Sequence, residues 1–306
     1  MEFSKIKEKL SVKKIIAIIV ASFILFELAA TVAVSESFLN TQRFAESEKG
    51  QSVLEKELSS VQYIKWLEGT AQSVDDESFT GLYLKNNATS HSNIILLHSL
   101  TTTAKDMAVY AYHFHSLGFN VYIPQYIKGS CTMGFEEKEQ VARVVNMITE
   151  KDEKATIFLF GVGIGATTSI LATTQSLPSN VKGVIADSPY SRVDELFKEN
   201  IKELYGFSAF PVVQLSSLYI KLAKGWKTDT VEILSSARES EIPILYIHGT
   251  EDSVVPVEHS NNLFEVTRAK GTDHITIYGA THLQALNTNA EKYWREVEAF
   301  IRNSMD

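Results

Sequence analysis

Short apolar runs alternate along most of the chain with longer stretches in which apolar residues recur every three or four positions. Such runs have the length of buried strands, whereas the longer stretches are typical of amphipathic helices. The strands are expected at residues 93–98, 119–124, 155–160, 181–187, 243–248 and 273–278, and helices between them at residues 104–117, 136–150, 164–175 and 257–270. This alternation predicts an α/β domain with a mostly parallel sheet covered by helices on both faces. Ligands of such sheets bind beyond the carboxyl ends of the strands, so we expect functional residues in the loops that follow them.

The N-terminal pattern is different. Residues 15–34 are predominantly apolar and interrupted by a single charged residue, Glu27, and at ~1.5 Å per residue they are long enough to cross the ~30 Å hydrocarbon core of a bilayer. Lysines dominate residues 1–14, whereas acidic residues are more frequent after the apolar stretch. This asymmetry predicts a single-pass transmembrane helix with a cytoplasmic N-terminus and a large domain outside. The alternative is a cleaved signal peptide with a site near Ala33 or Ser35, which would release a secreted protein.

Two regions fall outside the alternating pattern. Residues 35–75 carry apolar residues at helical spacing and predict a helical stalk between the membrane and a domain at residues 76–306. Residues 190–232 are rich in aromatic and aliphatic residues, contain Pro211 and give no strand signal, so we expect a helical cap over the carboxyl end of the sheet. The aromatic side chains would line a pocket for a small apolar ligand or an acyl ester, or would only pack the cap on the core.

Composition narrows the function classes. Charged residues make up 22% and hydrophobic residues 44% of the chain, as in globular proteins, and the net charge of −8 leaves no basic surface for nucleic acid. Cys131, the single cysteine, cannot form an intramolecular disulfide, so stability depends on the core. The sequence has no metal-ligand cluster and no phosphate-binding glycine loop, and we expect no cofactor. It identifies no protein partner.

The segment 157–166 carries the most specific chemistry. An apolar run is followed by Gly161, Gly163 and Gly165 and then by a helical pattern. This order fits the strand–turn–helix of a nucleophile elbow, G-x-S-x-G, in which a serine at the centre of the turn attacks an acyl carbon. Gly163 stands at that central position, and glycine has no side-chain oxygen.

Three further stretches join the elbow: residues 97–101 after a strand, residues 247–256 and residues 279–282. In this order they resemble the α/β-hydrolase superfamily over residues 79–302. The nearest resemblance is to single-span bacterial proteins with a serine-aminopeptidase-like or lysophospholipase-like domain. The resemblance implies that Asp252 is the acid and His282 the base of a triad. It also implies that the backbone N–H groups of Leu100 and Ile164 form an oxyanion hole, while His98 and His248 at strand ends are structural.

Three departures from the family pattern surround this site. Gly163 replaces the nucleophile, Ser99 stands where the family usually has glycine, and residues 125–131, beginning with Gln125, replace the family sequence Asp-x-Arg-Gly-His-Gly. Loss of a triad serine reduces turnover by on the order of 10⁶. We therefore expect a pseudoenzyme, a hydrolase-like domain that binds a ligand or partner without serine catalysis.

The alternative is an active ester, lipid or peptide hydrolase. Such an enzyme would use water activated by His282 or a displaced nucleophile. The candidates for that nucleophile are Cys131, Ser99, Ser130 and Ser188.

Overall fold

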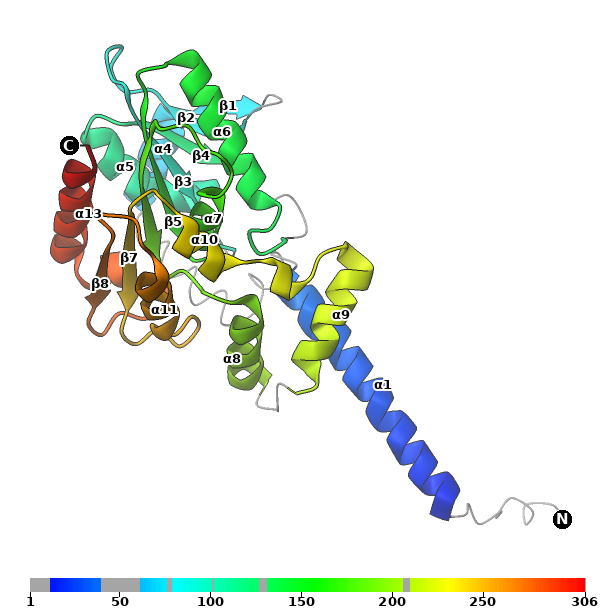
Figure 1. Cartoon of the computed structure of the whole chain (residues 1–306). Helices are drawn as coiled ribbons and strands as arrows, with labels where there is room; N and C mark the ends of the chain where they lie inside the picture. Colours follow the sequence, from blue (N-terminus) through cyan, green and yellow to red (C-terminus); the bar gives the residue numbers. More distant parts are fainter. Residues whose placement is uncertain are drawn as a thin grey trace.

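The centre of the domain is an 8-stranded sheet with the order β1-β2-β4-β3-β5-β6-β7-β8 (Figure 1). The structure is a computed structural model that describes residues 12–39, 61–75, 79–100, 102–126, 131–205 and 210–305. The strands are β1 Gln72–Asp75, β2 Thr80–Leu84, β3 Ser92–Leu97, β4 Asn120–Pro124, β5 Thr156–Val162, β6 Val181–Asp187, β7 Ile244–Gly249 and β8 Asp273–Ile277. Strands β3 to β8 are parallel, and β2 and β1 extend the β4 edge in antiparallel pairing. All the predicted parallel strands are confirmed, with ends within two residues of those expected.

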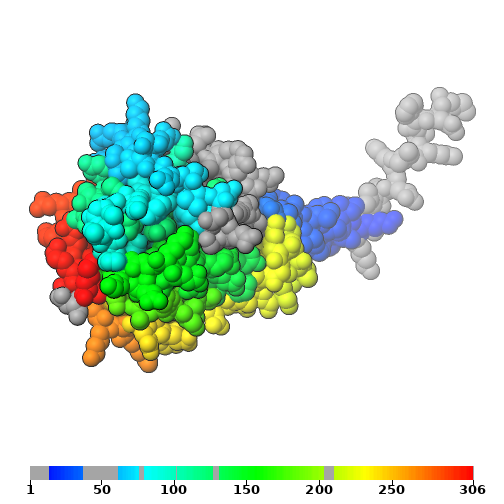
Figure 2. Space-filling view, turned by 90° about the horizontal axis from the view of Figure 1, so that it is seen from above, coloured from blue at the N-terminus to red at the C-terminus, as the bar shows by residue number. Residues whose placement is uncertain are grey.

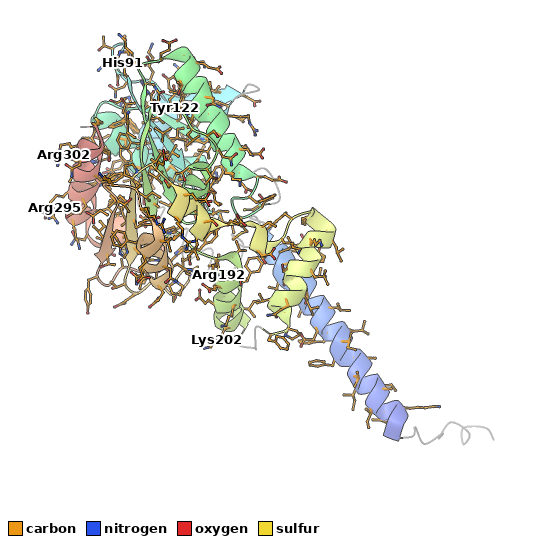
Figure 3. All side chains as sticks on the ribbon, viewed as in Figure 1. His91, Tyr122, Arg192, Lys202, Arg295 and Arg302 are labelled. Atoms are coloured by element: carbon orange, nitrogen blue, oxygen red, sulfur yellow. The ribbon has the colours of Figure 1, made fainter. Side chains whose placement is uncertain are left out.

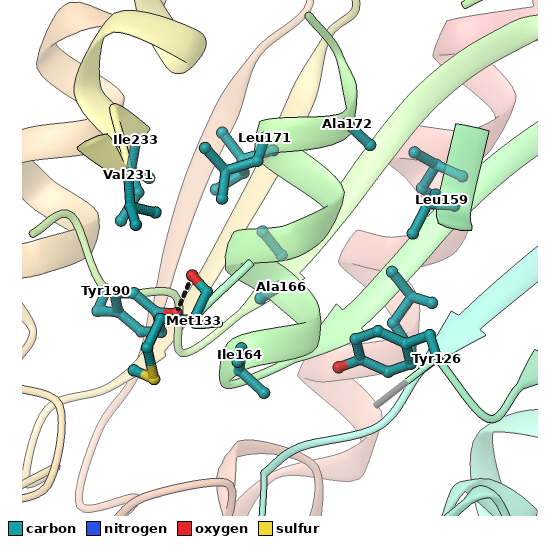
Figure 4. Close-up of a cluster of buried hydrophobic side chains, with 14 of the residues drawn as sticks. Tyr126, Met133, Leu159, Ile164, Ala166, Leu171, Ala172, Tyr190, Val231 and Ile233 are labelled. Atoms are coloured by element: carbon teal, nitrogen blue, oxygen red, sulfur yellow. Dashed lines mark hydrogen bonds between the residues drawn. The ribbon is translucent and has the colours of Figure 1, made fainter. Parts of the chain in front are cut away.

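Helices cover both faces of the sheet, as predicted. Alternate residues of β5 belong to two separate buried clusters, Ile157 and Leu159 to one, Phe158 and Phe160 to the other, as the period of a strand requires. The first cluster includes residues of α6 Glu137–Lys151, α7 Ile164–Ala172, α10 Ile233–Glu239 and α11 Glu258–Val266. The second includes residues of α4 Val61–Thr70, α5 Ala108–Ser116, α12 Ala285–Thr288 and α13 Ala290–Met305. Figure 4 shows α7 in the first cluster, with Ile164, Ala166 and Leu171 among their buried neighbours.

The predicted boundary between stalk and domain needs correction. Residues 72–75, which we assigned to a helical stalk ending at residue 75, form strand β1 and pair with β2, from Gln72 beside Tyr83 to Asp75 beside Thr80. This strand is short and largely exposed at the sheet edge, so it has no run of apolar residues to announce it. Before it, α4 packs on α5 through the fully buried Leu67. Residues 40–60 of the expected stalk lie outside the described residues.

The cap region is helical, as expected. It contains α8 Val193–Tyr205, α9 Val212–Lys224 and the short 3₁₀ helix η3 Thr228–Thr230. Figure 1 shows α8 and α9 beyond the carboxyl ends of the strands. In Figure 3, Arg192 lies at the sheet end of α8 and Lys202 near its far end, while His91, which precedes β3, lies at the opposite end of the sheet.

The N-terminal helix α1 spans Val12–Leu39 and projects away from the domain (Figure 2). Its segment Lys14–Glu36 is long and apolar enough to cross a membrane, and a signal sequence would have the same character. The helix includes the expected span at residues 15–34 and continues beyond it. Most of its apolar side chains are exposed, but Val34 and Ser35 near its end are buried.

Candidate active site

The elbow is formed where β5 ends at Val162 and α7 begins at Ile164. The outer glycines are required by close packing. A Cβ added at Gly161 would lie 2.2 Å from the backbone of Gly165, and one added at Gly165 would lie 2.1 Å from the carbonyl oxygen of Leu97. Both residues therefore allow α7 to start directly against β5 and β3. The predicted strand–turn–helix is confirmed.

Gly163 is in a different situation. Its backbone has φ +56° and ψ −118°, a conformation that L residues rarely adopt. A Cβ at this position would meet no backbone atom closely: its nearest neighbours would be Ser99 Oγ at 2.7 Å, Ser99 Cβ at 3.5 Å and Leu283 Cδ2 at 3.7 Å. The Ser99 hydroxyl therefore occupies the space in which the side chain of an elbow nucleophile would begin.

The sheet explains why these two residues meet. Leu97 of β3 pairs with Gly161 of β5 in parallel register, and Ser99 and Gly163 each lie two residues further along. Ser99 is buried, and its backbone N–H donates to Thr102 Oγ1 at 2.8 Å in a tight turn. Within the described residues its hydroxyl makes no hydrogen bond. The sequence marks Ser99 as a departure from the family pattern and as one of several candidate nucleophiles. The register of β3 and β5 is what brings it to the elbow.

Asp252 and His282 come together in the loops that follow β7 and β8. His282 Nδ1 lies 2.8 Å from Asp252 Oδ2, and Asp252 Oδ1 accepts hydrogen bonds from the backbone N–H groups of Val254 at 3.0 Å and Val255 at 2.8 Å. Burial alone would raise the pKa of Asp252, but the neighbouring His282 and His248 rings hold it well below its usual range. The carboxylate is therefore charged at neutral pH and holds Nδ1–H of His282, which leaves Nε2 as the basic nitrogen.

The two other histidines have structural contacts. The buried His248 ring lies with Nε2 2.7 Å from the carbonyl oxygen of Val255 and 3.4 Å from Asp252 Oδ2. It therefore braces the acid loop, residues 250–257 between β7 and α11, which carries Asp252. His98 Nδ1 lies 2.8 Å from the carbonyl oxygen of Ser99, and burial lowers the pKa of His98 and keeps the ring neutral. Both contacts fix loops of the site.

The two expected amide donors flank the elbow from different elements. Ile164 is the first residue of α7, and an N–H in the first turn of a helix has no intrahelical acceptor. Leu100 lies in the turn that follows β3, directly after Ser99. Their N–H groups remain candidates for the stabilisation of a carbonyl oxygen, independently of the side chain at position 163.

The other candidate nucleophiles have less favourable surroundings. Cys131 is fully buried, and burial, with the charge of Glu137, raises the pKa of its thiol well above the ordinary value, so the reactive thiolate is suppressed. Ser188 is also buried and donates its hydroxyl hydrogen to Asp187 Oδ1 at 2.9 Å. Ser130 lies outside the described residues. We assign no catalytic role to Cys131 or Ser188.

Two pockets adjoin the turn that carries Ser99, and both include Thr102 in their walls. One, of about 330 Å³, reaches Val162 and Leu283 beside the elbow. The other, of about 560 Å³, is lined by His98, Leu100 and Gln125 and extends to β1 and β2. The altered loop after β4 therefore contributes Gln125 to a pocket wall.

The cap is attached directly to the acid loop. Asn200 Nδ2 of α8 donates to the carbonyl oxygen of Val254 at 2.9 Å, and Glu199 of α8 lies 2.9 Å from His259 Nε2. These contacts were not foreseen from the sequence, because they join residues more than fifty positions apart that no local motif marks. Among the described residues no group of His, Cys, Asp and Glu could hold a metal ion.

Comparisons with solved structures identify the architecture. The Pyrococcus furiosus esterase Pf2001 superposes with a TM-score of 0.61 at 20% identity, over 79% of this chain and 95% of the esterase. Est1E from Butyrivibrio proteoclasticus superposes with a TM-score of 0.57 at 17% identity, over 77% of this chain and 99% of Est1E. The chain has the α/β-hydrolase fold. The expected fold class is thus confirmed.

Comparisons by sequence say less about activity. The chain matches no family model. The uncharacterized protein YqkD of Bacillus subtilis (strain 168) is 27% identical over 222 residues, which cover 70% of this chain and 72% of YqkD. The function therefore has to be argued from the site itself.

Proposed function

We propose that the chain is a membrane-anchored α/β-hydrolase-domain protein that binds an acyl ligand and forms no acyl-enzyme at its elbow. The apolar helix α1 and the lysines before it support an anchor with the domain outside the cell membrane. The intact Asp252–His282 pair and the amides of Leu100 and Ile164 support a polar site for the carbonyl group of a ligand.

One observation carries this proposal. Among the described residues, the atom nearest to a Cβ placed on Gly163 is Ser99 Oγ, at 2.7 Å. The space at the centre of the elbow is therefore filled by a side chain from the turn that follows β3. A ligand carbonyl above the elbow would meet the amide donors and His282, whose side chain is 13% exposed, but no serine at the turn itself.

The test is acylation of the native protein. Full-length protein is treated with a fluorophosphonate probe, and turnover of a short p-nitrophenyl ester is measured in parallel. We expect no labelling and no turnover above that of His282→Gln, while a fluorescent fatty-acid analogue binds the native protein more tightly than His282→Gln. An adduct on any side chain of the native protein would contradict a binding role.

A second candidate function is favoured by the same hydroxyl. In this alternative Ser99 Oγ attacks the acyl carbon, its proton passes to His282 Nε2, and the imidazolium returns that proton to the departing alkoxide. Water then cleaves the acyl–Ser99 ester, again with His282 as base. The support is the position of Ser99 Oγ beside the elbow and its lack of a hydrogen bond within the described residues.

Ser99→Ala separates the two functions. If the native protein is labelled and Ser99→Ala is not, while the control Ser188→Ala still is, Ser99 is the nucleophile. Turnover that survives Ser99→Ala but is lost in His282→Gln would indicate water activated by His282. If the protein only binds its ligand, Ser99→Ala changes neither labelling nor turnover.

A further inference from the structure

The cap helix α9 packs against the part of α1 nearest the domain and crosses it at an angle (Figure 1). Val34 of α1 belongs to the same buried cluster as Val212, Val213 and Ile220 of α9. At the upper end of this contact Tyr219 Oη donates to Glu36 Oε1 at 2.6 Å, and Lys224 Nζ lies 3.3 Å from the same oxygen. The two helices are therefore in contact, each contributes buried apolar residues to one cluster, and Glu36 joins them through polar contacts.

The direction of α9 places part of it at membrane depth. The candidate span ends at Glu36, level with the contacts of Tyr219 and Lys224. Figure 1 shows that the beginning of α9 lies further along α1, toward the N-terminus of the chain. With a rise of ~1.5 Å per residue, Val212 is about 10 Å from Tyr219 along the helix axis. If α1 spans a bilayer, the first half of α9 lies within its outer leaflet.

The surface of α9 fits this depth. Leu218 and Leu222, four positions apart on one side of the helix, are 53% and 77% exposed, and Phe210 just before the helix is 73% exposed. On α1, Leu28 and Val32, eight and four residues before Glu36, are 49% and 41% exposed. Transfer of exposed apolar side chains from water into lipid lowers the free energy of the system, so such side chains next to a membrane-spanning helix favour contact with the bilayer. Lys221 and Lys224 near the end of α9 would lie at the level of the headgroups.

We propose that α9 is a membrane-contact helix beside α1, with Leu218 facing the acyl chains of the outer leaflet and Leu222 at the boundary between acyl chains and headgroups. Since α8 is hydrogen-bonded to the acid loop, the cap then connects the bilayer to the site. The ligand class follows from this placement, and this step rests on the proposed function: an amphiphile with an acyl chain, taken from the lipid bilayer beneath the cap.

Depth-dependent fluorescence quenching tests the helix placement. Full-length protein is reconstituted in phosphatidylcholine–phosphatidylglycerol vesicles with a bimane label on Leu218→Cys or Leu222→Cys. The native Cys131 is fully buried, and unsubstituted protein measures any label that it takes up. Ile24→Cys on α1, where the native side chain is 51% exposed, is the lipid-facing reference. Leu117→Cys is the water-facing control, because Leu117 is 42% exposed at the end of α5, at the amino end of the sheet.

We expect both α9 labels to lose most of their fluorescence to nitroxide-bearing lipids, as Ile24→Cys does, with Leu218→Cys quenched by deeper nitroxides than Leu222→Cys. Leu117→Cys should respond to aqueous iodide instead. Iodide quenching of both α9 labels would overturn the proposal, as would an Ile24→Cys label that lipids do not quench. So would a disulfide between two unlabelled copies of Leu222→Cys, formed with an added oxidant, if the labelled variant is not quenched by lipids. The assay contains no acyl ligand, so its failure leaves the binding test of the proposed function unaffected.

Discussion

The acid–base side of the site and its nucleophile side differ in how much of the hydrolase pattern they keep. On the acid–base side, Asp252 and His282 meet at 2.8 Å, and two backbone N–H groups hold the carboxylate. On the nucleophile side, the turn, the helix start and the outer glycines are present, but Gly163 and Ser99 exchange the residue types that the family usually has at the two positions. The comparison teaches that the turn, the helix start and the outer glycines of an elbow can form without a side-chain oxygen on its central residue.

The largest expected effect comes from reversing this exchange. The double variant Gly163→Ser/Ser99→Gly should place a hydroxyl at the turn and remove the one that obstructs it. We expect p-nitrophenyl ester turnover to rise by at least about 10³-fold over the native protein, since removal of a triad serine costs on the order of 10⁶. Fluorophosphonate labelling of residue 163, located by mass spectrometry, checks the result.

The single variants are the controls for this prediction. Gly163→Ser alone should gain much less, because its Cβ would lie 2.7 Å from Ser99 Oγ and one of the two must shift. Ser99→Gly alone should gain nothing. If the double variant remains unlabelled although it folds, the amide donors of Leu100 and Ile164 do not form a working oxyanion hole.

The next largest effect is the loss of stability when each of two glycines in the elbow, Gly165 and Gly163, is replaced by alanine. Gly165→Ala forces a Cβ to within 2.1 Å of the Leu97 carbonyl oxygen, whereas Gly163→Ala meets only a side-chain hydroxyl. We expect Gly165→Ala to lower the free energy of unfolding by about 3 kcal/mol, as overpacking against a fixed backbone does. Gly163→Ala should cost about 1 kcal/mol, chiefly for its positive φ. Urea titrations followed by tryptophan fluorescence measure both, and equal losses would show that packing does not distinguish the two positions.

The same contrast separates what sequence can predict from what it cannot. The run that ends in Gly161, Val162 and Gly163 predicts a buried strand and a turn because the signal is local. Asp252 and His282 could be paired because a family resemblance supplies their distant contact. The position of Ser99 Oγ over Gly163 depends on the register between β3 and β5, which no local pattern records. Strand β1 is missed for another reason, since a short exposed edge strand needs little apolar surface.

The tertiary contacts of the cap are even harder to predict from local sequence than strand β1. The sequence predicts a helical cap, and α8 and α9 are helices, but nothing in residues 212–224 indicates that α9 packs on α1. An amphipathic pattern identifies the apolar face of a helix but does not identify the element that packs against that face. The partner is a helix almost 200 residues earlier in the chain, as the Tyr219–Glu36 hydrogen bond, with a separation of 183 residues, makes plain.

The smallest expected effect concerns the acid–base side and appears as a pH dependence of stability. The folded-state pKa of Asp252 is depressed, so its charge contributes stability that is present above the unfolded pKa of about 4 and is lost as pH falls through the lower folded value. A buried carboxylate held in this way contributes on the order of 2 kcal/mol. Asp252→Asn lacks the charge at every pH and cannot lose this contribution on acidification. The native protein should therefore lose about 2 kcal/mol more than Asp252→Asn between pH 6 and pH 2, in urea titrations at each pH. Parallel losses in the two proteins would mean that the His282 and His248 contacts do not stabilise the ionised carboxylate, and the acid–base side would then be no better preserved than the nucleophile side.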